Sequence, residues 1–451
     1  MKTVLLIAYH FPPSTEVGGI RVANFAKGLS VIGWKPIILT VKDKYVEKID
    51  IGRMKGIESI RIVKAGRTYK LTNLYFLLKK MWYVLLGNPD PDSRKTRYSD
   101  ARVDISERES FSMRIKRYYR AFINLPDTES NWIIPASYKA IRELRNSKID
   151  CILTSCPPYS CHLVGLIVKT VSGASWIADF RDPWRKGEKF GVFPTCGLSL
   201  AIDRWMEKRV IRRADIVLAN TKAMVADFTT RFRAVGAEKF IYLPNMIDKE
   251  LYRGFRHFQK YPEFTISYAG TLYLGRSPEP LMRAIQELTA EKRITGDGIR
   301  LKLLGDCASV NGTSISNIIE RYGLEKTVEV PGQVPYATAL EIIRKSHLGL
   351  LLAPEQPLQI PAKVYEYMGL GTNILALAKD GATKDFLNAT GCGRAFDPSD
   401  ITGIKEFLLE RMALQEQGDM EDFRGSTDAF EVSTVVEKLS CELDKLCGRK
   451  I

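Results

Sequence analysis

The 451-residue sequence has no cysteines at the spacing of a zinc site. Its eight cysteines are scattered, and the densest group, Cys151, Cys156 and Cys161, has members five residues apart. Structural zinc sites need closely spaced pairs such as C-x-x-C, so a zinc-stabilised domain is excluded. Because no secretion signal is recognisable, we expect the thiols to stay reduced in the cytosol.

Long apolar runs are also missing. The run at residues 3–8 is too short for a signal peptide and is followed by Pro12-Pro13. The stretch from Cys151 to Val168 has no charged residue over the length of a membrane span. However, Pro157-Pro158 divides that stretch, which therefore reads as a strand, a turn and a helix. We expect a cytoplasmic protein that does not cross the membrane.

Acidic residues are too few to balance the basic ones. The net charge is +15, and residues 61–120 carry 15 Lys or Arg against 6 Asp or Glu, which gives +9. Aromatic and apolar residues stand between these cations, as around Lys79, Lys80 and Trp82. The pattern favours a pair of amphipathic helices lying on an anionic membrane surface. The alternative is a helical subdomain packed on the sheet, with its basic face in solvent. We expect no nucleic-acid partner.

Apolar strands alternate with helical patterns in both halves of the chain. Residues 3–8, 19–34 and 35–41 read as strand, helix and strand, and residues 264–306 repeat the pattern. This order is typical of a parallel sheet with helices on both faces. The sequence therefore predicts an α/β fold with two doubly wound, Rossmann-like domains.

A glycine-rich loop separates the first strand from its helix. Gly18 and Gly19 precede that helix, so their backbone amides are candidates for contact with a phosphate. The loop does not have the spacing G-x-G-x-x-G, and a simple connection is an equally good interpretation. His10, at the start of the same loop, is a candidate catalytic residue.

A short helix is predicted after Pro361, and a buried strand follows at residues 373–378. Lys363 lies in the first turn of this helix, an unfavourable place for a cation unless an anion is bound there. Glu366 lies three residues later on the same face. Together they suggest a nucleotide site, with the lysine on phosphate and the glutamate on ribose. The alternative is an ordinary surface ion pair between the two.

Polar loops follow two strands in the middle of the first half. Residues 155–160 and 179–184 come after apolar strands, and in a parallel sheet such loops line the crevice at the carboxyl edge. We therefore expect Asp179, Arg181 and Asp182 to face it, as candidate catalytic residues. The alternative is an internal Arg–Asp pair that only shapes the loop.

Several of these segments resemble bacterial GT-B glycosyltransferases of the retaining family 4 group, which includes capsule and lipopolysaccharide sugar transferases. The resembling segments are residues 9–29, 155–160, 179–184, 214–221, 243–248, 264–288 and 361–378. They stand in the order found in the family, and residues 44–125 lack the resemblance. Some relatives have a histidine where Ser155 stands here.

The resemblance implies two domains that face each other across a cleft. Residues 1–255 would form the acceptor-binding domain, with a basic helical insertion at about 68–125. Residues 256–427 would bind the nucleotide sugar, and residues 428–451 would form a helix that packs back on the first domain.

The resemblance also assigns donor-binding roles. Lys363 and Glu366 fall on the segment that binds the diphosphate and ribose, and Arg276 falls where relatives have a second phosphate-binding cation. Gly18 and Gly19 would approach the phosphates, and Gln333 lies in the loop that contacts the base. Two family residues are missing: Leu358 replaces a glutamate, and Thr271 replaces an arginine.

The function implied is a retaining, metal-independent glycosyltransferase. Its donor would be a UDP- or GDP-type nucleotide sugar, used as a substrate with no further cofactor. Its acceptor would be a glycan or a polyprenyl-linked sugar in surface polysaccharide biosynthesis, reached at the inner face of the cytoplasmic membrane. Two alternatives remain: a non-catalytic binding protein with this fold, and a sugar-nucleotide epimerase.

Overall fold

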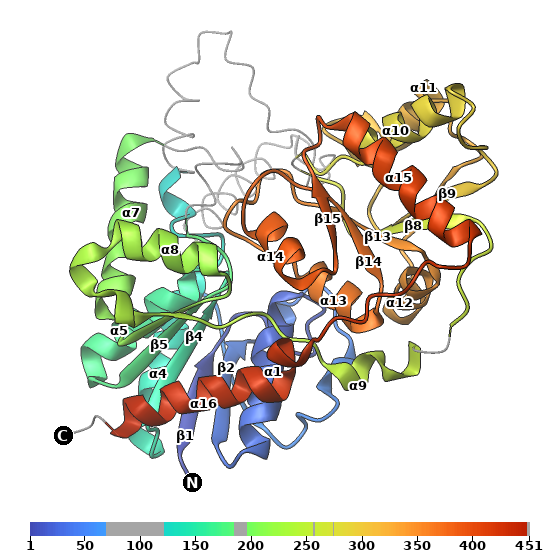
Figure 1. Cartoon of the computed structure of the whole chain (residues 1–451). Helices are drawn as coiled ribbons and strands as arrows, with labels where there is room; N and C mark the ends of the chain where they lie inside the picture. The colour runs from blue at the N-terminus through green and yellow to red at the C-terminus, as the bar shows by residue number, and fades with distance from the viewer. Residues whose placement is uncertain (69–120, 185–195, 256–257, 274, 449–451) are drawn as a thin grey trace, which may run out of the picture. The chain divides into compact units, whose positions relative to one another are not determined.

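The computed structural model describes residues 1–68, 121–184, 196–255, 258–273 and 275–448 (Figure 1). The chain divides into two compact units. Unit 1 comprises Met1–Ala219, Phe228–Ile241 and Val436–Ile451, and unit 2 comprises Asn220–Asp227 and Tyr242–Val435. Each unit is described by itself below. The predicted basic insertion lies almost wholly outside the described residues.

Unit 1 contains a seven-stranded sheet with the order β3-β2-β1-β4-β5-β6-β7. Its paired strands from β3 to β6 all run parallel. The strands are β1 (Thr3–Ile7), β2 (Lys35–Val41), β3 (Arg61–Ala65), β4 (Cys151–Cys156), β5 (Ser175–Phe180), β6 (Ile216–Ala219) and β7 (Phe240–Tyr242). The helices between them are α1 (Gly18–Val31), α4 (Ile133–Asn146), α5 (Ser160–Ser172), α7 (Gly197–Arg213) and α8 (Lys222–Arg231). The first part of α8, up to Asp227, belongs to unit 2. This is the strand order of a doubly wound sheet.

The central strands of unit 1 are buried along their whole length. Every residue of β1 and of β4 is buried, as expected for parallel strands covered by helices on both faces. Helix α5 comes close to the sheet at Gly165, where a Cβ would lie 2.5 Å from the ring of Trp176. A residue with any side chain at this position would push the helix off the sheet.

The last helix of the chain completes unit 1. Helix α16 (Val432–Gly448) packs against α1, where a Cβ on Gly28 would overlap the side chain of Val436. The indole nitrogen of Trp34 donates to the Ser440 hydroxyl at 3.1 Å. Residues from the two ends of the sequence therefore share one core.

Unit 2 contains a six-stranded parallel sheet with the order β12-β9-β8-β13-β14-β15. The strands are β8 (Phe264–Ala269), β9 (Ile299–Leu304), β12 (Val328–Gly332), β13 (Leu348–Leu352), β14 (Asn373–Leu377) and β15 (Gly393–Phe396). The helices are α9 (Lys249–Tyr252), α10 (Glu279–Ala290), α11 (Ile315–Arg321), α12 (Tyr336–Lys345), α13 (Ala362–Leu370), α14 (Ala382–Thr390) and α15 (Ile401–Glu416). A two-stranded hairpin, β10 (Ser309–Val310) and β11 (Thr313–Ser314), lies between β9 and α11.

The sheet of unit 2 has a separate apolar core on each face. One core contains residues of α10, α11 and α15, and the other contains residues of α12, α13 and α14. The order of the six strands repeats that of unit 1 from β3 to β6, so both units are doubly wound. The predicted α/β fold with two Rossmann-like sheets is confirmed.

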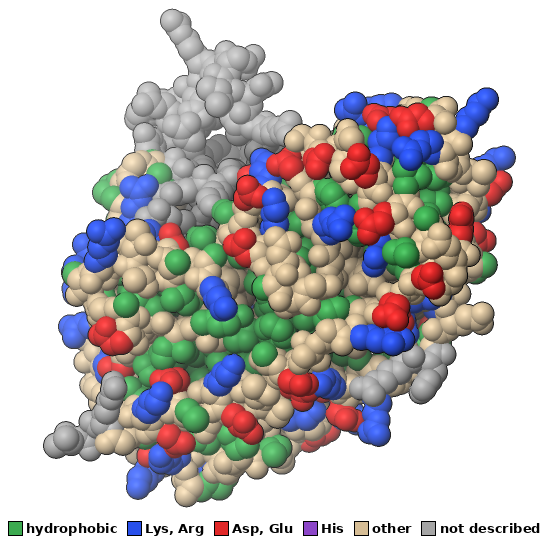
Figure 2. All heavy atoms as spheres, viewed as in Figure 1, with side chains coloured by type: hydrophobic (Ala, Val, Ile, Leu, Met, Phe, Trp, Pro, Cys, Tyr) green, Lys and Arg blue, Asp and Glu red, His purple; other side chains and the backbone are tan. Residues whose placement is uncertain are grey.

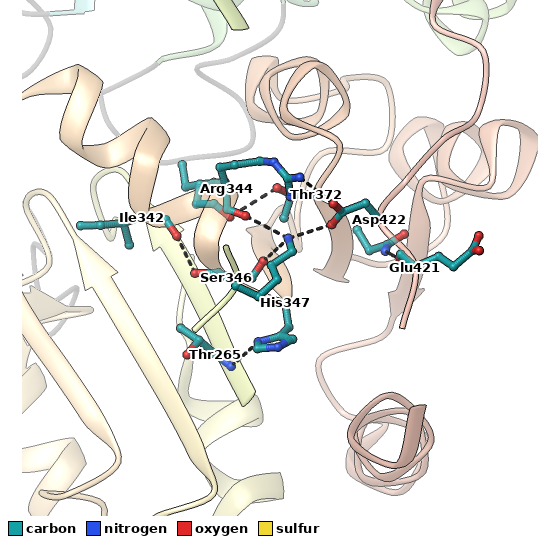
Figure 3. A network of polar contacts seen from close by, with 11 residues as sticks. Thr265, Ile342, Arg344, Ser346, His347, Thr372, Glu421 and Asp422 are labelled. Atoms are coloured by element: carbon teal, nitrogen blue, oxygen red, sulfur yellow. Dashed lines mark hydrogen bonds and ion pairs between the residues drawn. The ribbon is translucent and has the colours of Figure 1, made fainter. Parts of the chain in front are cut away.

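A partly buried polar network fixes the segment that follows α15 to unit 2 (Figure 3). The guanidinium of Arg344 lies 2.7 Å from one oxygen of Asp422, and the Lys260 ammonium lies 2.8 Å from the other. Lys260 also donates to the carbonyls of Arg344 and Ser346. Both cations therefore anchor one carboxylate, and the chain leading to α16 is fixed at that point.

Within the described ranges, no helix is both long and apolar enough to cross a bilayer.

Candidate nucleotide site and its surroundings

Three glycines mark the carboxyl edge of the sheet in unit 2. Gly270 follows β8, Gly305 follows β9 and Gly332 ends β12, and each has a positive φ, of 156°, 104° and 78°. The amide of Gly305 donates to the carbonyl of Gly332 at 2.7 Å, and a Cβ on Gly305 would overlap the carbonyl oxygen of Gly270. Backbone therefore packs on backbone here, and only glycine fits.

Lys363 lies directly over this glycine edge. Its ammonium is 4.4 Å from the centre of the Tyr268 ring and 3.4 Å from the Tyr268 hydroxyl, which itself donates to the carbonyl of Thr271. A Cβ on Gly270 would overlap the ammonium group. The lysine belongs to the first turn of α13, which begins after Pro361 as predicted and ends at Gly371 with φ +72°.

The electrostatics around Lys363 favour an anion. Burial, and then the positive charge of Arg276, lower the pKa of Lys363 to about 8. Neither cation forms an ion pair with a carboxylate among the described residues. Both cations are partly buried. Partial burial of a charge without an ion pair is costly, and a second charge of the same sign raises that cost. A bound anion such as a diphosphate would relieve it.

Arg276 lies in the loop between β8 and α10. Its guanidinium is 4.4 Å from the centre of the Tyr273 ring. Burial raises the pKa of Tyr268, and the charge of Arg276 opposes part of that rise. The loop is held by a hydrogen bond from the Gly275 amide to the Asn311 side chain at 3.1 Å. The structure thus places Arg276 close enough to Lys363 and Tyr268 for its charge to act on both.

Glu366 lies one turn along α13 from Lys363, but the two do not form the surface ion pair that was the alternative interpretation. One carboxylate oxygen of Glu366 accepts from the Tyr336 hydroxyl at 3.0 Å. Tyr336 is the first residue of α12, and Gln333 is exposed in the loop just before it. Three of the four predicted donor residues of this unit, Arg276, Lys363 and Glu366, are therefore neighbours.

In unit 1, His10, Gly18 and Arg181 lie together. A Cβ on Gly18 would be 3.1 Å from the Arg181 guanidinium and 3.5 Å from the His10 ring. Burial, and then the charge of Arg181, lowers the pKa of His10 to about 4, so its imidazole is neutral at pH 7. A neutral imidazole can accept a proton or a hydrogen bond.

The loop glycines of unit 1 are tightly placed. A Cβ on Gly19 would lie 3.2 Å from the Cα of Phe11, so the start of α1 packs against the loop after β1. The Gly19 amide already donates to the Glu16 carbonyl at 3.0 Å. A phosphate contact at this loop would therefore depend on the Gly18 amide.

Asp179 and Arg181 are internal to unit 1. Asp179 is completely buried, with the Arg21 guanidinium at 2.9 Å and the Ser155 hydroxyl at 2.7 Å. Arg181 donates to three backbone carbonyls, those of Cys156, Pro157 and Gly18, at 2.6–2.7 Å. The expectation that Asp179 faces a crevice is therefore wrong, because Arg21 on α1 holds it inside. Asp182 is half-buried in the following loop.

Sequence reasoning missed the residues that surround the two cations. Tyr268, Tyr273 and Tyr336 were not singled out, although two of them flank a predicted strand-to-glycine loop. A tyrosine two residues before a glycine at the end of a strand is the only available signal for Tyr268. The partner of Asp179 was also missed, because Arg21 is 158 positions away in the sequence.

Among the described residues, no group of three or more His, Cys, Asp or Glu side chains is arranged to hold a metal ion.

No family model and no curated protein sequence matches the chain. Solved structures do. Anabaena HepE in complex with UDP is 14% identical, with a TM-score of 0.62 over 99% of this chain and 100% of that one. Sucrose-phosphate synthase from Thermosynechococcus elongatus is 13% identical, with a TM-score of 0.61 over 99% and 100%. The apo form of the lipopolysaccharide outer core galactosyltransferase WaaB is 12% identical, with a TM-score of 0.58 over 98% and 99%. At these identities the likeness establishes the fold, which is GT-B.

Proposed function

We propose that the chain is a glycosyltransferase that uses a nucleoside-diphosphate sugar, and that unit 2 binds the donor. The observation that carries this proposal is the pair of cations Lys363 and Arg276. They stand without a carboxylate partner among the described residues, beside an edge of the sheet built from glycine backbone. Such an arrangement suits a diphosphate.

The structural neighbours support a donor of this class. HepE has been solved with UDP and with UDP-glucose, and WaaB is a galactosyltransferase. We therefore propose a UDP-type donor, with a GDP-type donor as the alternative.

In this proposal each donor residue has one role. Lys363 and Arg276 bind the diphosphate and stabilise the charge that develops on it as the glycosidic bond breaks. Glu366 accepts hydrogen bonds from the ribose hydroxyls, and Tyr336, which donates to it, fixes its orientation. Gln333 lies beside the base.

The residues of unit 1 have acceptor-side or structural roles. His10 is a neutral candidate for accepting a proton, and Asp182 is a second candidate at the end of β5. The Gly18 amide is the proposed phosphate contact of this unit, since the Gly19 amide donates to the Glu16 carbonyl. Arg181 holds the loops around His10 in place, and Asp179 stabilises the sheet through Arg21.

The finer parts of the proposal come from the sequence resemblance. They are retention of the anomeric configuration, metal independence, membership of family 4 and a cytoplasmic role in surface polysaccharide biosynthesis with a glycan or polyprenyl-linked acceptor. Unchanged turnover in EDTA and an NMR assignment of the product anomer would test the chemistry. Loss of activity in EDTA or an inverted product would refute the corresponding part.

Nucleotide binding and donor turnover test the proposed function directly. We expect one nucleoside diphosphate among UDP, GDP and ADP to raise the melting temperature. At a ligand concentration of 100 Kd the added stability is about 2.7 kcal/mol. The matching nucleotide sugar should also be hydrolysed slowly when no acceptor is present. A thermal shift without turnover would favour the non-catalytic binding protein. Release of an isomerised nucleotide sugar would favour the epimerase. If no nucleotide shifted the melting temperature, the donor site would be refuted.

The basic segment at residues 61–120 leads us to propose peripheral attachment to an anionic membrane. Each Lys or Arg near such a surface contributes about 1 kcal/mol at physiological salt, so several suffice for reversible binding. Neutralising Lys79, Lys80, Arg114, Lys116 and Arg117 should reduce co-sedimentation with phosphatidylglycerol vesicles at low salt. Equal recovery with neutral and anionic vesicles would contradict this role.

A further inference from the structure

Helix α7 of unit 1 exposes apolar side chains that no described element covers. Leu198 is 63% exposed and Trp205 is 56% exposed. They are seven residues apart, which places them on the same side of a helix. Ile202 lies beside them and is half-exposed. Trp34, Trp132, Trp176 and Trp184 are all buried, so Trp205 is the one exposed tryptophan among the described residues.

Basic residues surround this apolar stripe. The exposed cations of α7 are Arg204, Lys208, Arg209, Arg212 and Arg213. Figure 2 shows Lys and Arg side chains over this part of unit 1. Arg209 lies 5.3 Å from the centre of the Trp205 ring. By helical spacing, Lys208 falls on one side of Trp205 and Arg209 on the other.

Both acidic residues of α7 are turned away from this face. Asp203 accepts from the indole nitrogen of Trp184 at 2.9 Å. Glu207 is 2% exposed and forms a two-point contact with Arg231 at 2.9 and 3.0 Å. The exposed face of α7 is therefore purely cationic and apolar.

The ordinary explanations cover only part of this face. Arg212 and Arg213 lie in the last turn, where cations complement the helix dipole. That argument does not apply to Lys208 or Arg209, and it explains neither exposed apolar side chain. Lys208, Arg209, Arg212 and Arg213 form no ion pair with any described residue.

A cavity continues the cationic face at the carboxyl end of α7. It has a volume of about 490 Å³ and is lined by Arg212 and Arg213, together with Lys169 and Lys239. Its single carboxylate, Asp215, is held by Lys169 at 2.7 Å. Burial lowers the pKa of Lys239. The other three cations of this cavity, Arg212, Arg213 and Lys239, can therefore bind an anionic group of phosphate size.

We propose that α7 is a docking surface for an anionic phospholipid bilayer, with Trp205 and Leu198 in the headgroup boundary, the flanking cations on lipid phosphates, and the cavity at the helix end seating one headgroup. Apolar side chains at the centre of a basic face favour lipid over a soluble polyanion. The surface goes beyond the proposed sugar transfer, and it is separate from the basic segment at residues 61–120.

Quenching by brominated phospholipids tests this surface. The protein used should carry Trp82→Phe, because residue 82 lies outside the described ranges. Trp205 is then the one exposed tryptophan that remains, since the other four are buried. We expect vesicles of phosphatidylglycerol with brominated acyl chains to quench its fluorescence, and zwitterionic vesicles to have little effect. Replacing Lys208, Arg209, Arg212 and Arg213 with Gln should weaken vesicle binding about fivefold for each charge removed.

A matched variant controls for net charge. Replacing four exposed cations of unit 2 with Gln, at Arg253, Arg293, Lys326 and Arg424, removes the same charge from another surface. This variant should bind vesicles within about twofold of the parent protein if α7 is the docking element. Equal weakening in both variants, or binding without quenching of Trp205, would overturn the proposal. Tight binding to a DNA oligonucleotide without vesicle binding would replace the lipid with a nucleic acid.

Discussion

Asp179→Ala should destabilise unit 1 by about 3–5 kcal/mol, the cost of leaving one partner of a buried ion pair without the other. The Arg21 side chain is 4% exposed and that of Asp179 is 0% exposed, so water cannot replace the lost carboxylate. The Ser155 hydroxyl would lose its acceptor as well. All six tryptophans lie within residues 1–219, so tryptophan fluorescence in urea reports the unfolding of unit 1.

A surface ion pair in the same unit provides the control. Asp43 and Lys64 are 2.6 Å apart but 49% and 38% exposed, so Asp43→Ala should cost at most about 1 kcal/mol. Replacing both Arg21 and Asp179 with apolar residues should restore part of the stability, since no unpaired charge remains. A stable Asp179→Ala protein that binds donor but does not turn it over would show that Asp179 acts in the chemistry instead.

Lys363→Ala should weaken binding of the nucleoside diphosphate by about 1.5–3 kcal/mol, roughly ten- to a hundredfold in Kd, since it removes a charge-assisted contact. The ligand-free protein should lose little stability, because the variant also removes a partly buried charge that has no carboxylate partner. Isothermal titration calorimetry gives the Kd. Lys384→Ala, which removes an exposed cation paired with Asp380 in the same unit, should leave it unchanged.

The same lysine sets the pH dependence of binding. In the free protein its pKa is lowered to about 8, and a bound diphosphate raises it, so binding takes up a proton above that pH. Affinity should therefore be constant between about pH 7 and 8, where the terminal phosphate is already ionised, and fall as the pH rises further. Lys363→Arg, which stays charged, should bind with no such fall. An unchanged Kd in Lys363→Ala would remove this residue from the site.

The sequence was sufficient for the fold because its signals are local. Apolar strands, the glycine loop before α1, and the proline and glycine around α13 each depend on neighbouring residues. The order of these elements then identified two doubly wound sheets. Lys363 and Glu366 were found the same way, because they share one helix turn.

Long-range contacts decided what the sequence could not show. The sequence suggested that Asp179 is an exposed acid at the end of β5. In the structure Arg21, which lies on α1, forms an ion pair with it inside unit 1. Tyr268 and Tyr336 matter only because α13 brings Lys363 and Glu366 to them. The exposed face of α7 carries no carboxylate because Trp184 binds Asp203 and Arg231 binds Glu207. The spacing of residues in the sequence does not reveal these contacts.

The packing of α16 has a consequence for synthesis on the ribosome. Unit 1 includes the residues from Val436 onward, and the side chain of Val436 fills the space beside Gly28. While residues 242–435 are being translated, the contacts of α1 with Val436 and of Trp34 with Ser440 cannot yet exist. We infer that unit 2 can complete its core first, although it is made later, while α1 of the amino-terminal unit still lacks its contacts with α16. A chaperone would be most useful to this chain in the interval between synthesis of α1 and synthesis of α16.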